Sequence, residues 1–189
     1  MKFEKRLKLL SYDSMVRRTK VLMKKDYILS LSGGTINAKK GDEIDLPRWQ
    51  ALYLKSIDVA DIKEEEVDIN YLNSYHFKEK RNQAPNQLSP LPQDFYIKIS
   101  SFIKSLDKAI SQNPTHMLIN DREAAEKNFI ELSESRLLKL IRLSQTNGDD
   151  LRDRMTPEEF LIYSTIKNII FSWRSYILNL SKGGVNNEQ

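Results

Sequence analysis

Short runs of alternating apolar and polar residues fill the first third of the chain, and turn-forming residues separate them. Gly33-Gly34 and Gly41-Asp42 supply two of these turns. Alternating runs separated by glycine-containing turns are typical of β-hairpins. The pattern therefore predicts a small β-rich unit, whose expected strands lie at residues 16–23, 27–31, 35–37, 44–46 and 58–62.

A helix is expected to close this unit at Pro47, because proline cannot donate to a strand ladder but fits the first turn of a helix. Over residues 47–57, Trp49, Leu52 and Tyr53 lie on one side of the predicted helix. A large aromatic side chain at such a position usually packs inward. We therefore expect Pro47 and Trp49 to be structural anchors, with Trp49 in the core beneath the helix.

Helical periodicity dominates the rest of the chain. A helix is expected over residues 67–82, followed by a proline-containing connector over about 83–93. Apolar residues then recur every three or four positions, which predicts a helix that begins after Asp94; these residues are Phe95, Ile99, Phe102, Leu106 and Ile110. Another helix is predicted at about 121–145. The fold class is thus α+β.

The division into domains follows from this change of pattern. Residues 1–66 form the predicted β-rich domain, including a basic N-terminal leader, and residues 67–189 form the predicted helical domain. A polar tail at 181–189 ends the second domain.

The last predicted helix has the clearest start signal in the chain. Thr156 precedes Pro157, and Glu159 is placed to close a capping box. From there to Leu180, apolar residues occupy more than half of the helix circumference, whereas a surface helix has one apolar face. This helix is therefore expected to lie either in the centre of a bundle or in an interface between proteins.

Composition narrows the class of protein. No apolar run reaches the roughly 20 residues of a membrane span, and the basic N-terminus lacks the apolar region of a signal peptide. The chain has no cysteine, which excludes disulfides and thiol catalysis. We expect a cytoplasmic protein without membrane contact.

Positive charge is concentrated near the N-terminus. Residues 1–25 hold nine basic residues against two acidic ones, a net +7, which leaves −3 for the remaining chain because the total is +4. This asymmetry indicates a polyanion or an acidic partner, with a merely solvated basic face as the alternative. The candidate contacts with DNA or a partner are Arg17, Arg18, Lys20, Lys24 and Lys25.

The sequence offers no catalytic motif. His76 and His116 are 40 residues apart, and neither lies in a metal-ligand spacing or near an obvious carboxylate partner. The glycines at 33–34 belong to no phosphate-binding motif. The acidic clusters at 64–66 and 149–153 have charged surroundings, whereas general acid–base catalysis needs a carboxylate tuned by burial. We therefore expect no catalytic residue, no metal and no cofactor, and an interaction protein rather than an enzyme.

Three strings, in this order, resemble a subunit of the archaeal GINS replication complex. Residues 20–51, which include LPRWQA, resemble the small B domain of that family with its closing helix. LPQDFY at 91–96 is similar to the motif that opens a long helix of the A domain. Leu132–Leu143, within ELSESRLLKLIRL, is similar to a helix with an arginine-x-x-lysine core. The resemblance spans about residues 16–180. The leader at residues 1–15 has no counterpart in the family pattern.

The order of B domain before A domain resembles the class called two-three in archaea. This resemblance implies a non-catalytic scaffold that supports the replicative helicase at the fork. The implied assembly is a heterotetramer joined through helical A domains, with two copies each of two subunit types. The implied partners are a sister GINS subunit, the MCM helicase, a RecJ-like protein and primase. The resemblance also implies a location at the nucleoid and a weak contact of the chain with DNA.

Two predicted helices are expected to build the subunit interface, because interface cores favour aromatic anchors. The candidate interface residues are Phe95, Ile99, Phe102, Phe160, Tyr163, Phe171, Trp173 and Tyr176. The alternative is that these residues form an intramolecular core. Two other functions stay open: a free-standing nucleic-acid-binding protein with a helical dimerisation domain, and a small enzyme whose site a partner chain completes. Tyr27 is the only aromatic residue between positions 16 and 48, which disfavours the first because base stacking needs aromatic side chains.

Overall fold

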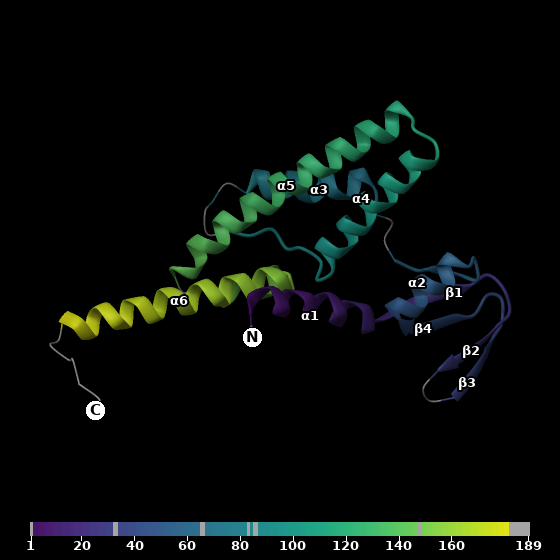
Figure 1. Ribbon diagram of the computed structural model, residues 1–189, viewed down its shortest axis with the longest axis horizontal. Coiled ribbons are helices and arrows are strands. Elements are labelled where there is room, and N and C mark those ends of the chain that lie inside the picture. Colours follow the sequence, from purple (N-terminus) through teal and green to yellow (C-terminus); the bar gives the residue numbers. More distant parts are fainter. Residues whose placement is uncertain are drawn as a thin grey trace. The chain divides into compact units, whose positions relative to one another are not determined.

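Two units follow one another along the chain in the computed structural model, which is of the α+β class (Figure 1). They are Met1–Glu66 and Val67–Gln189. The structure describes residues 2–31, 34–64, 67–82, 84, 87–146 and 149–181. Within these residues, no helix is both long enough and apolar enough to cross a lipid bilayer.

The first unit contains a small sheet, a hairpin and two helices. Its elements are α1 (Phe3–Val16), β1 (Arg18–Met23), β2 (Tyr27–Leu31), β3 (Gly34–Ala38), β4 (Glu43–Pro47), α2 (Arg48–Ser56) and β5 (Ala60–Ile62). β1 lies between β4 and β5 in an antiparallel sheet, and β2 pairs with β3 in a separate antiparallel hairpin. Of the predicted Gly33-Gly34 turn, Gly33 lies outside the described residues. α1 is an addition to the predicted elements.

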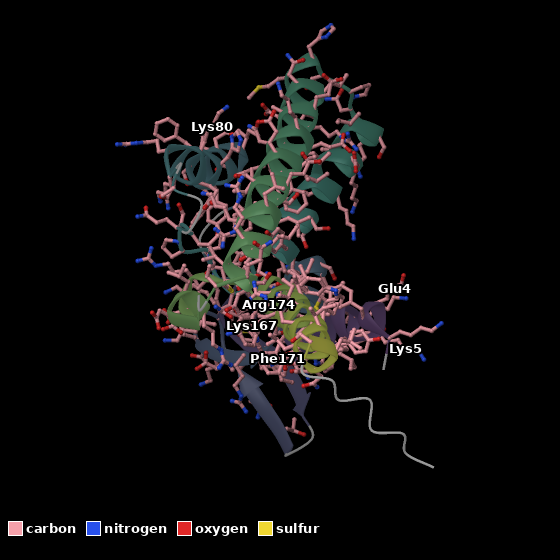
Figure 2. All side chains as sticks on the ribbon, turned by 90° about the vertical axis from the view of Figure 1, so that its left-hand side faces the viewer. Glu4, Lys5, Lys80, Lys167, Phe171 and Arg174 are labelled. Carbon is pink, nitrogen blue, oxygen red and sulfur yellow. The ribbon has the colours of Figure 1, made fainter. Side chains whose placement is uncertain are left out.

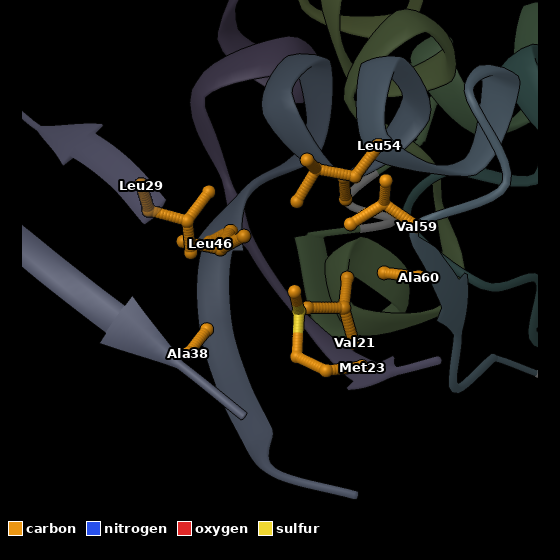
Figure 3. Close-up of a cluster of buried hydrophobic side chains, with 9 residues drawn as sticks. Val21, Met23, Leu29, Ala38, Leu46, Leu54, Val59 and Ala60 are labelled. Carbon is orange, nitrogen blue, oxygen red and sulfur yellow. The ribbon is translucent and has the colours of Figure 1, made fainter. Parts of the chain in front are cut away.

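Alternation along β1 decides which side chains face the core. Thr19, Val21 and Met23 are buried, while Arg18 and Lys20 are exposed, as the two-residue period of a strand requires. The apolar residues join a buried cluster beneath α2 (Figure 3), which comprises Val21, Met23, Leu29, Ala38, Leu46, Ala51, Leu54, Val59 and Ala60. The cations of β1 therefore lie on the outer face of the sheet.

α2 covers this cluster with the side opposite to the one expected. Ala51 is 0% and Leu54 1% exposed, whereas Trp49 is 53% exposed. Residue 49 lies two positions before Ala51, or about 200° round the helix, so burying Ala51 turns Trp49 outward. The prediction that Trp49 anchors the core is therefore wrong. Pro47 ends β4 and is the N-cap of α2 rather than a residue of its first turn.

The second unit is helical, as predicted. Its elements are α3 (Ile69–Arg81), α4 (Phe95–Gln112), α5 (His116–Ser144), the 3-10 helix η1 (Asp149–Arg154) and α6 (Pro157–Ser181). α5 packs against α3, α4 and α6. It begins five residues earlier than predicted, because the Thr115 side chain caps it by accepting from the Leu118 N–H at 3.3 Å.

Candidate functional site

The two halves of α6 have different surroundings. Near its start, α6 buries Glu159, Leu161 and Tyr163. From residue 168 onward its large apolar side chains are mostly exposed: Ile169 63%, Phe171 71%, Trp173 62%, Tyr176 63%, Ile177 43%, Leu178 58% and Leu180 48%. Phe171 and Arg174 on this half are labelled in Figure 2. We call residues 168–181 the exposed end of α6.

The chemistry of this exposed end differs from that of an ordinary solvated helix. Arg174 is the only charged residue between positions 168 and 181, whereas the outer face of a surface helix is normally charged and polar. Ile169, Trp173 and Tyr176 follow one another at intervals of four and three residues, so they share one side of α6. A contiguous apolar surface with aromatic anchors is typical of a protein-binding site.

The structure divides the predicted interface residues into two groups. Phe171, Trp173 and Tyr176 belong to the exposed end of α6. Phe95 and Ile99 are 0% and Tyr163 is 2% exposed, all within the two core clusters of the helical unit. Phe102 and Phe160 are half-buried against the same clusters.

The prediction that Phe95, Ile99 and Tyr163 meet a second subunit is therefore corrected. Their side chains are covered by the chain itself, so a subunit contact through them would require the core to open. The four-residue spacing of Phe95 and Ile99 places them on one side of α4, and this side is the one that the core covers. The interface candidates that are exposed, Phe171, Trp173 and Tyr176, all lie on α6.

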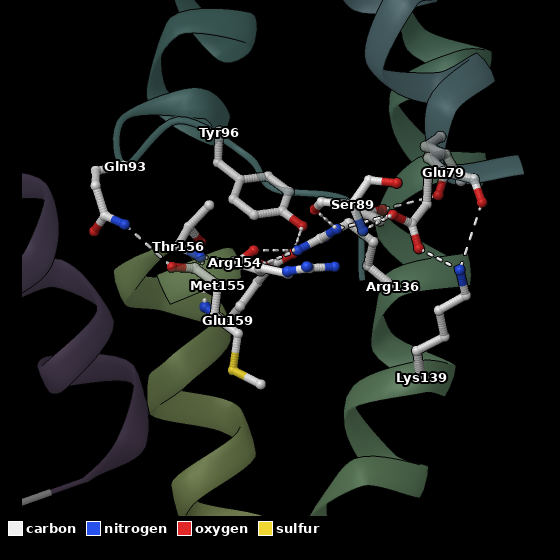
Figure 4. Close-up of polar contacts among 12 residues, drawn as sticks. Glu79, Ser89, Gln93, Tyr96, Arg136, Lys139, Arg154, Met155, Thr156 and Glu159 are labelled. Carbon is white, nitrogen blue, oxygen red and sulfur yellow. Dashed lines mark hydrogen bonds and ion pairs between the residues drawn. The ribbon is translucent and has the colours of Figure 1, made fainter. Parts of the chain in front are cut away.

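A charged cluster lies inside the helical unit around Arg136, which is 0% exposed (Figure 4). The Arg136 Nε donates to Glu159 Oε1. Nη1 donates to Glu79 Oε2 at 2.9 Å and to the Ser89 carbonyl at 2.7 Å. Nη2 donates to Glu159 Oε2 at 2.7 Å and to the Arg154 carbonyl at 3.0 Å. All five guanidinium N–H groups therefore have an acceptor.

Lys139 completes the cluster one helical turn after Arg136. Its Nζ donates to Glu79 Oε1 at 2.5 Å and to the Asn82 carbonyl at 2.6 Å. Two cations thus face the two carboxylates of Glu79 and Glu159. Burial alone would lower the pKa of Arg136, but hydrogen bonding and the charges of these carboxylates outweigh burial and raise it.

Tyr96 and Thr156 bind the same Glu159 carboxylate. The Tyr96 hydroxyl donates to Glu159 Oε1 at 2.7 Å, and burial together with the charge of Glu159 raises the pKa of Tyr96. The predicted capping box of α6 is present, since the Thr156 N–H donates to Glu159 Oε2 at 3.0 Å and the Glu159 N–H donates to Thr156 Oγ1 at 3.3 Å. Glu159 therefore both caps α6 and joins it to α4 and α5.

This charged cluster has the properties of a structural link rather than of a reactive site, because its donors are already bound to acceptors of the chain. Sequence reasoning identified Glu159 as a helix cap but missed its ion pair with Arg136, and it missed Glu79 altogether. A signal was present on the other side of the pairing, since Arg136 and Lys139 interrupt the apolar positions Leu132, Leu140 and Leu143 of α5. Cations within an apolar stripe need buried carboxylate partners.

A small cavity of about 210 Å³ lies between α3 and α5, lined by His76, Glu79, Lys80, Glu131, Leu132 and Ser135. His76 Nε2 lies 3.2 Å from Glu131 Oε2, so His76 does have a carboxylate partner, contrary to the sequence-based expectation. Among the described residues, no group of three or more histidines and carboxylates is arranged to hold a metal ion.

Three of the five basic residues that were predicted to contact DNA or a partner form ion pairs with carboxylates of the same chain. Arg17 Nη2 lies 3.0 Å from Asp13 Oδ2. Lys24 Nζ lies 2.6 Å and Lys25 Nζ 3.2 Å from the Asp58 carboxylate, and their hydrogen bonds lower the pKa of Asp58. Arg18 and Lys20 are exposed on β1, and no described carboxylate is within ion-pairing distance of either. The cationic surface of the sheet is thus smaller than the charge count predicts.

No protein-family model matches the sequence, and a search of curated proteins finds no match. What the chain does is therefore inferred from its own residues and from the resemblance in the three strings.

Proposed function

We propose that this chain is a non-catalytic scaffold subunit of a GINS-type DNA replication complex of the archaeal two-three class. The observation that carries the proposal is the exposed end of α6, where Phe171, Trp173 and Tyr176 are each more than 60% exposed. Large aromatic side chains with a single charge among them are unfavourable in contact with water. A protein partner that covers this surface would remove it from water.

The family resemblance supplies the identity of the complex. A β-rich unit precedes a helical unit, in the order of the two-three class. In the LPQDFY string, Leu91 and Phe95 belong to a core cluster, and in the third string Arg136 and Lys139 belong to the charged cluster. These strings therefore specify how the helical unit folds, and this fold leaves the end of α6 uncovered by the residues of its own unit.

In this proposal the helical unit is the assembly unit. A sister GINS subunit covers the exposed end of α6 in a two-plus-two heterotetramer in the cytoplasm, at the nucleoid. The complex supports the MCM helicase together with a RecJ-like protein, and contacts primase. The β-rich unit offers the apolar outer face of α2, with Trp49 and Tyr53, to these partners. DNA contact is restricted to Arg18 and Lys20, because the other three candidate cations are paired with carboxylates.

A pull-down from native extract after nuclease treatment tests the proposal. The tagged wild-type chain is expected to recover a second GINS-type subunit and the MCM helicase. A Trp173→Gln/Tyr176→Gln variant is expected to lose the sister subunit, because these side chains lie in the proposed interface. Trp49→Gln/Tyr53→Gln is the matched control, since it removes an equally exposed aromatic pair from another helix and should keep the sister subunit. The proposal would be contradicted if the chain were recovered alone. It would also be contradicted if an untreated sample recovered only nucleic acid with the chain.

A further inference from the structure

The outer side of α1 is both apolar and basic. α1 has 14 residues, and the one it buries is Ser14. Leu9 is 53%, Tyr12 68% and Val16 61% exposed. Their spacing of three and four residues places them in one stripe along the helix. We call these three residues the outer stripe of α1.

Four cations flank the outer stripe: Lys2, Lys5, Arg6 and Lys8. All are exposed, and Lys5 extends away from α1 (Figure 2). In the part of the chain that the structure describes, no carboxylate lies within ion-pairing distance of them. Other cations of the same unit do have carboxylate partners, as in the pairs Arg17–Asp13, Lys24–Asp58 and Lys63–Glu43. The positive charge of α1 is therefore left for a partner.

A second apolar stripe lies on the opposite side of α1. Leu7 and Leu10 are half-buried and lie on the side of Ser14. Each residue of the outer stripe follows an inner one by two positions, which is about 200° round the helix. A helix that lies in a membrane surface has a single wide apolar face opposite a polar one. α1 instead has two narrow apolar sides, which suits a helix held between two protein surfaces.

We propose that α1 binds an acidic segment of a partner protein, whose apolar side chains pack on the outer stripe while its carboxylates pair with the flanking cations. Charge complementarity selects an acidic partner. The outer stripe selects a protein over a nucleic acid, because phosphates would pair with the lysines but leave Leu9, Tyr12 and Val16 in water. This inference goes beyond the scaffold proposal, since it uses no residue of the exposed end of α6.

Fluorescence anisotropy with the full chain tests this inference. The probe is a labelled synthetic helical peptide of leucine and glutamate, with leucine on one face and glutamate on its flanks. We expect the wild-type chain to bind it, and added salt to weaken binding because salt screens exposed charges. Lys5→Glu/Lys8→Glu and Leu9→Gln/Tyr12→Gln/Val16→Gln should each weaken binding by about tenfold or more. Glutamine keeps helix propensity high, so an unchanged circular dichroism spectrum separates lost contacts from a lost helix.

Matched controls make the result specific to α1. Lys39→Glu/Lys40→Glu makes the same change of net charge at exposed positions of the same unit, and it should bind the peptide within about twofold of wild type. The Trp173→Gln/Tyr176→Gln variant should also bind normally, so failure of this inference is distinguishable from failure of the scaffold proposal. Equal loss in the Lys39/Lys40 control would overturn the inference. So would a chain that binds duplex DNA or phosphatidylglycerol vesicles but not the peptide.

Discussion

Arg136 shows how single residues hold the helical unit together. Its guanidinium is fully buried, yet each of its N–H groups meets a carboxylate or a carbonyl oxygen. A buried charge is tolerated when it is paired and hydrogen-bonded, and it becomes costly when one partner is removed. The cluster that joins Arg136 and Lys139 to Glu79 and Glu159 therefore acts as one unit.

Replacement of Arg136 by methionine is expected to destabilise the chain by about 3–5 kcal/mol, because it leaves Glu159 without its buried cation and Glu79 with only Lys139. Urea unfolding of the two proteins measures the difference. Arg142→Met is the control, since Arg142 lies on the same helix but is exposed, and it should cost less than about 1 kcal/mol. An Arg136→Met midpoint equal to that of wild type would show that the charged cluster contributes nothing to stability.

The Tyr96 hydroxyl, which donates to Glu159, predicts a loss of stability at high pH. Because its pKa is raised in the folded chain, its contribution is fully present below about pH 10, the ordinary tyrosine pKa, and is lost as the pH rises above that value. Tyr96→Phe should remove this part of the alkaline loss and cost about 1 kcal/mol near neutral pH, through the lost bond to Glu159. Urea midpoints on either side of pH 10 measure both effects. Tyr12→Phe, at an exposed site, should leave the alkaline loss as in wild type.

At the scale of the element, periodicity predicts which residues share a side but not which side is covered. The helix expected at 47–57 is α2 at Arg48–Ser56, yet the core lies under Ala51 and Leu54 instead of Trp49. The same limit applies to α4, because an amphipathic repeat looks alike in a core and in an interface. The ion pair between Arg136 and Glu79 joins residues 57 positions apart, a distance over which local pattern carries no information.

The reversed orientation of α2 makes a direct stability prediction. Leu54→Ala is expected to destabilise the chain by about 2–5 kcal/mol, because it leaves a cavity in the buried cluster. Trp49→Ala removes a larger side chain but should cost less than about 1 kcal/mol, since Trp49 is 53% exposed. Thermal or urea unfolding compares the two variants. A larger loss of stability for Trp49→Ala than for Leu54→Ala would show that Trp49 is part of the core.

At the scale of the whole molecule, the described residues form one buried apolar cluster in the first unit and two in the second, and each unit leaves helix surfaces uncovered. In the first unit these surfaces lie on α1 and on the outer face of α2, and in the second on the end of α6. The sequence predicted the excess of apolar residues on the last helix, because that excess is visible in its composition alone. It could not divide them into buried and exposed groups, since that division depends on tertiary contacts, such as the cluster that joins Leu140 and Leu143 of α5 to Tyr163 of α6.

The mass of the purified chain, measured by light scattering at tens of micromolar, tests the central claim most directly. A monomer has a mass of 22.1 kDa. When the sister subunit is absent, the exposed end of α6 is expected to pair with the same surface of a second copy, because both copies leave large aromatic side chains in water. We therefore predict that the purified wild-type chain has at least twice this mass. Ile169→Gln/Trp173→Gln/Tyr176→Gln should reduce it to the monomer without lowering thermal stability. A wild-type chain that stays a monomer under these conditions would contradict α6 as the assembly surface.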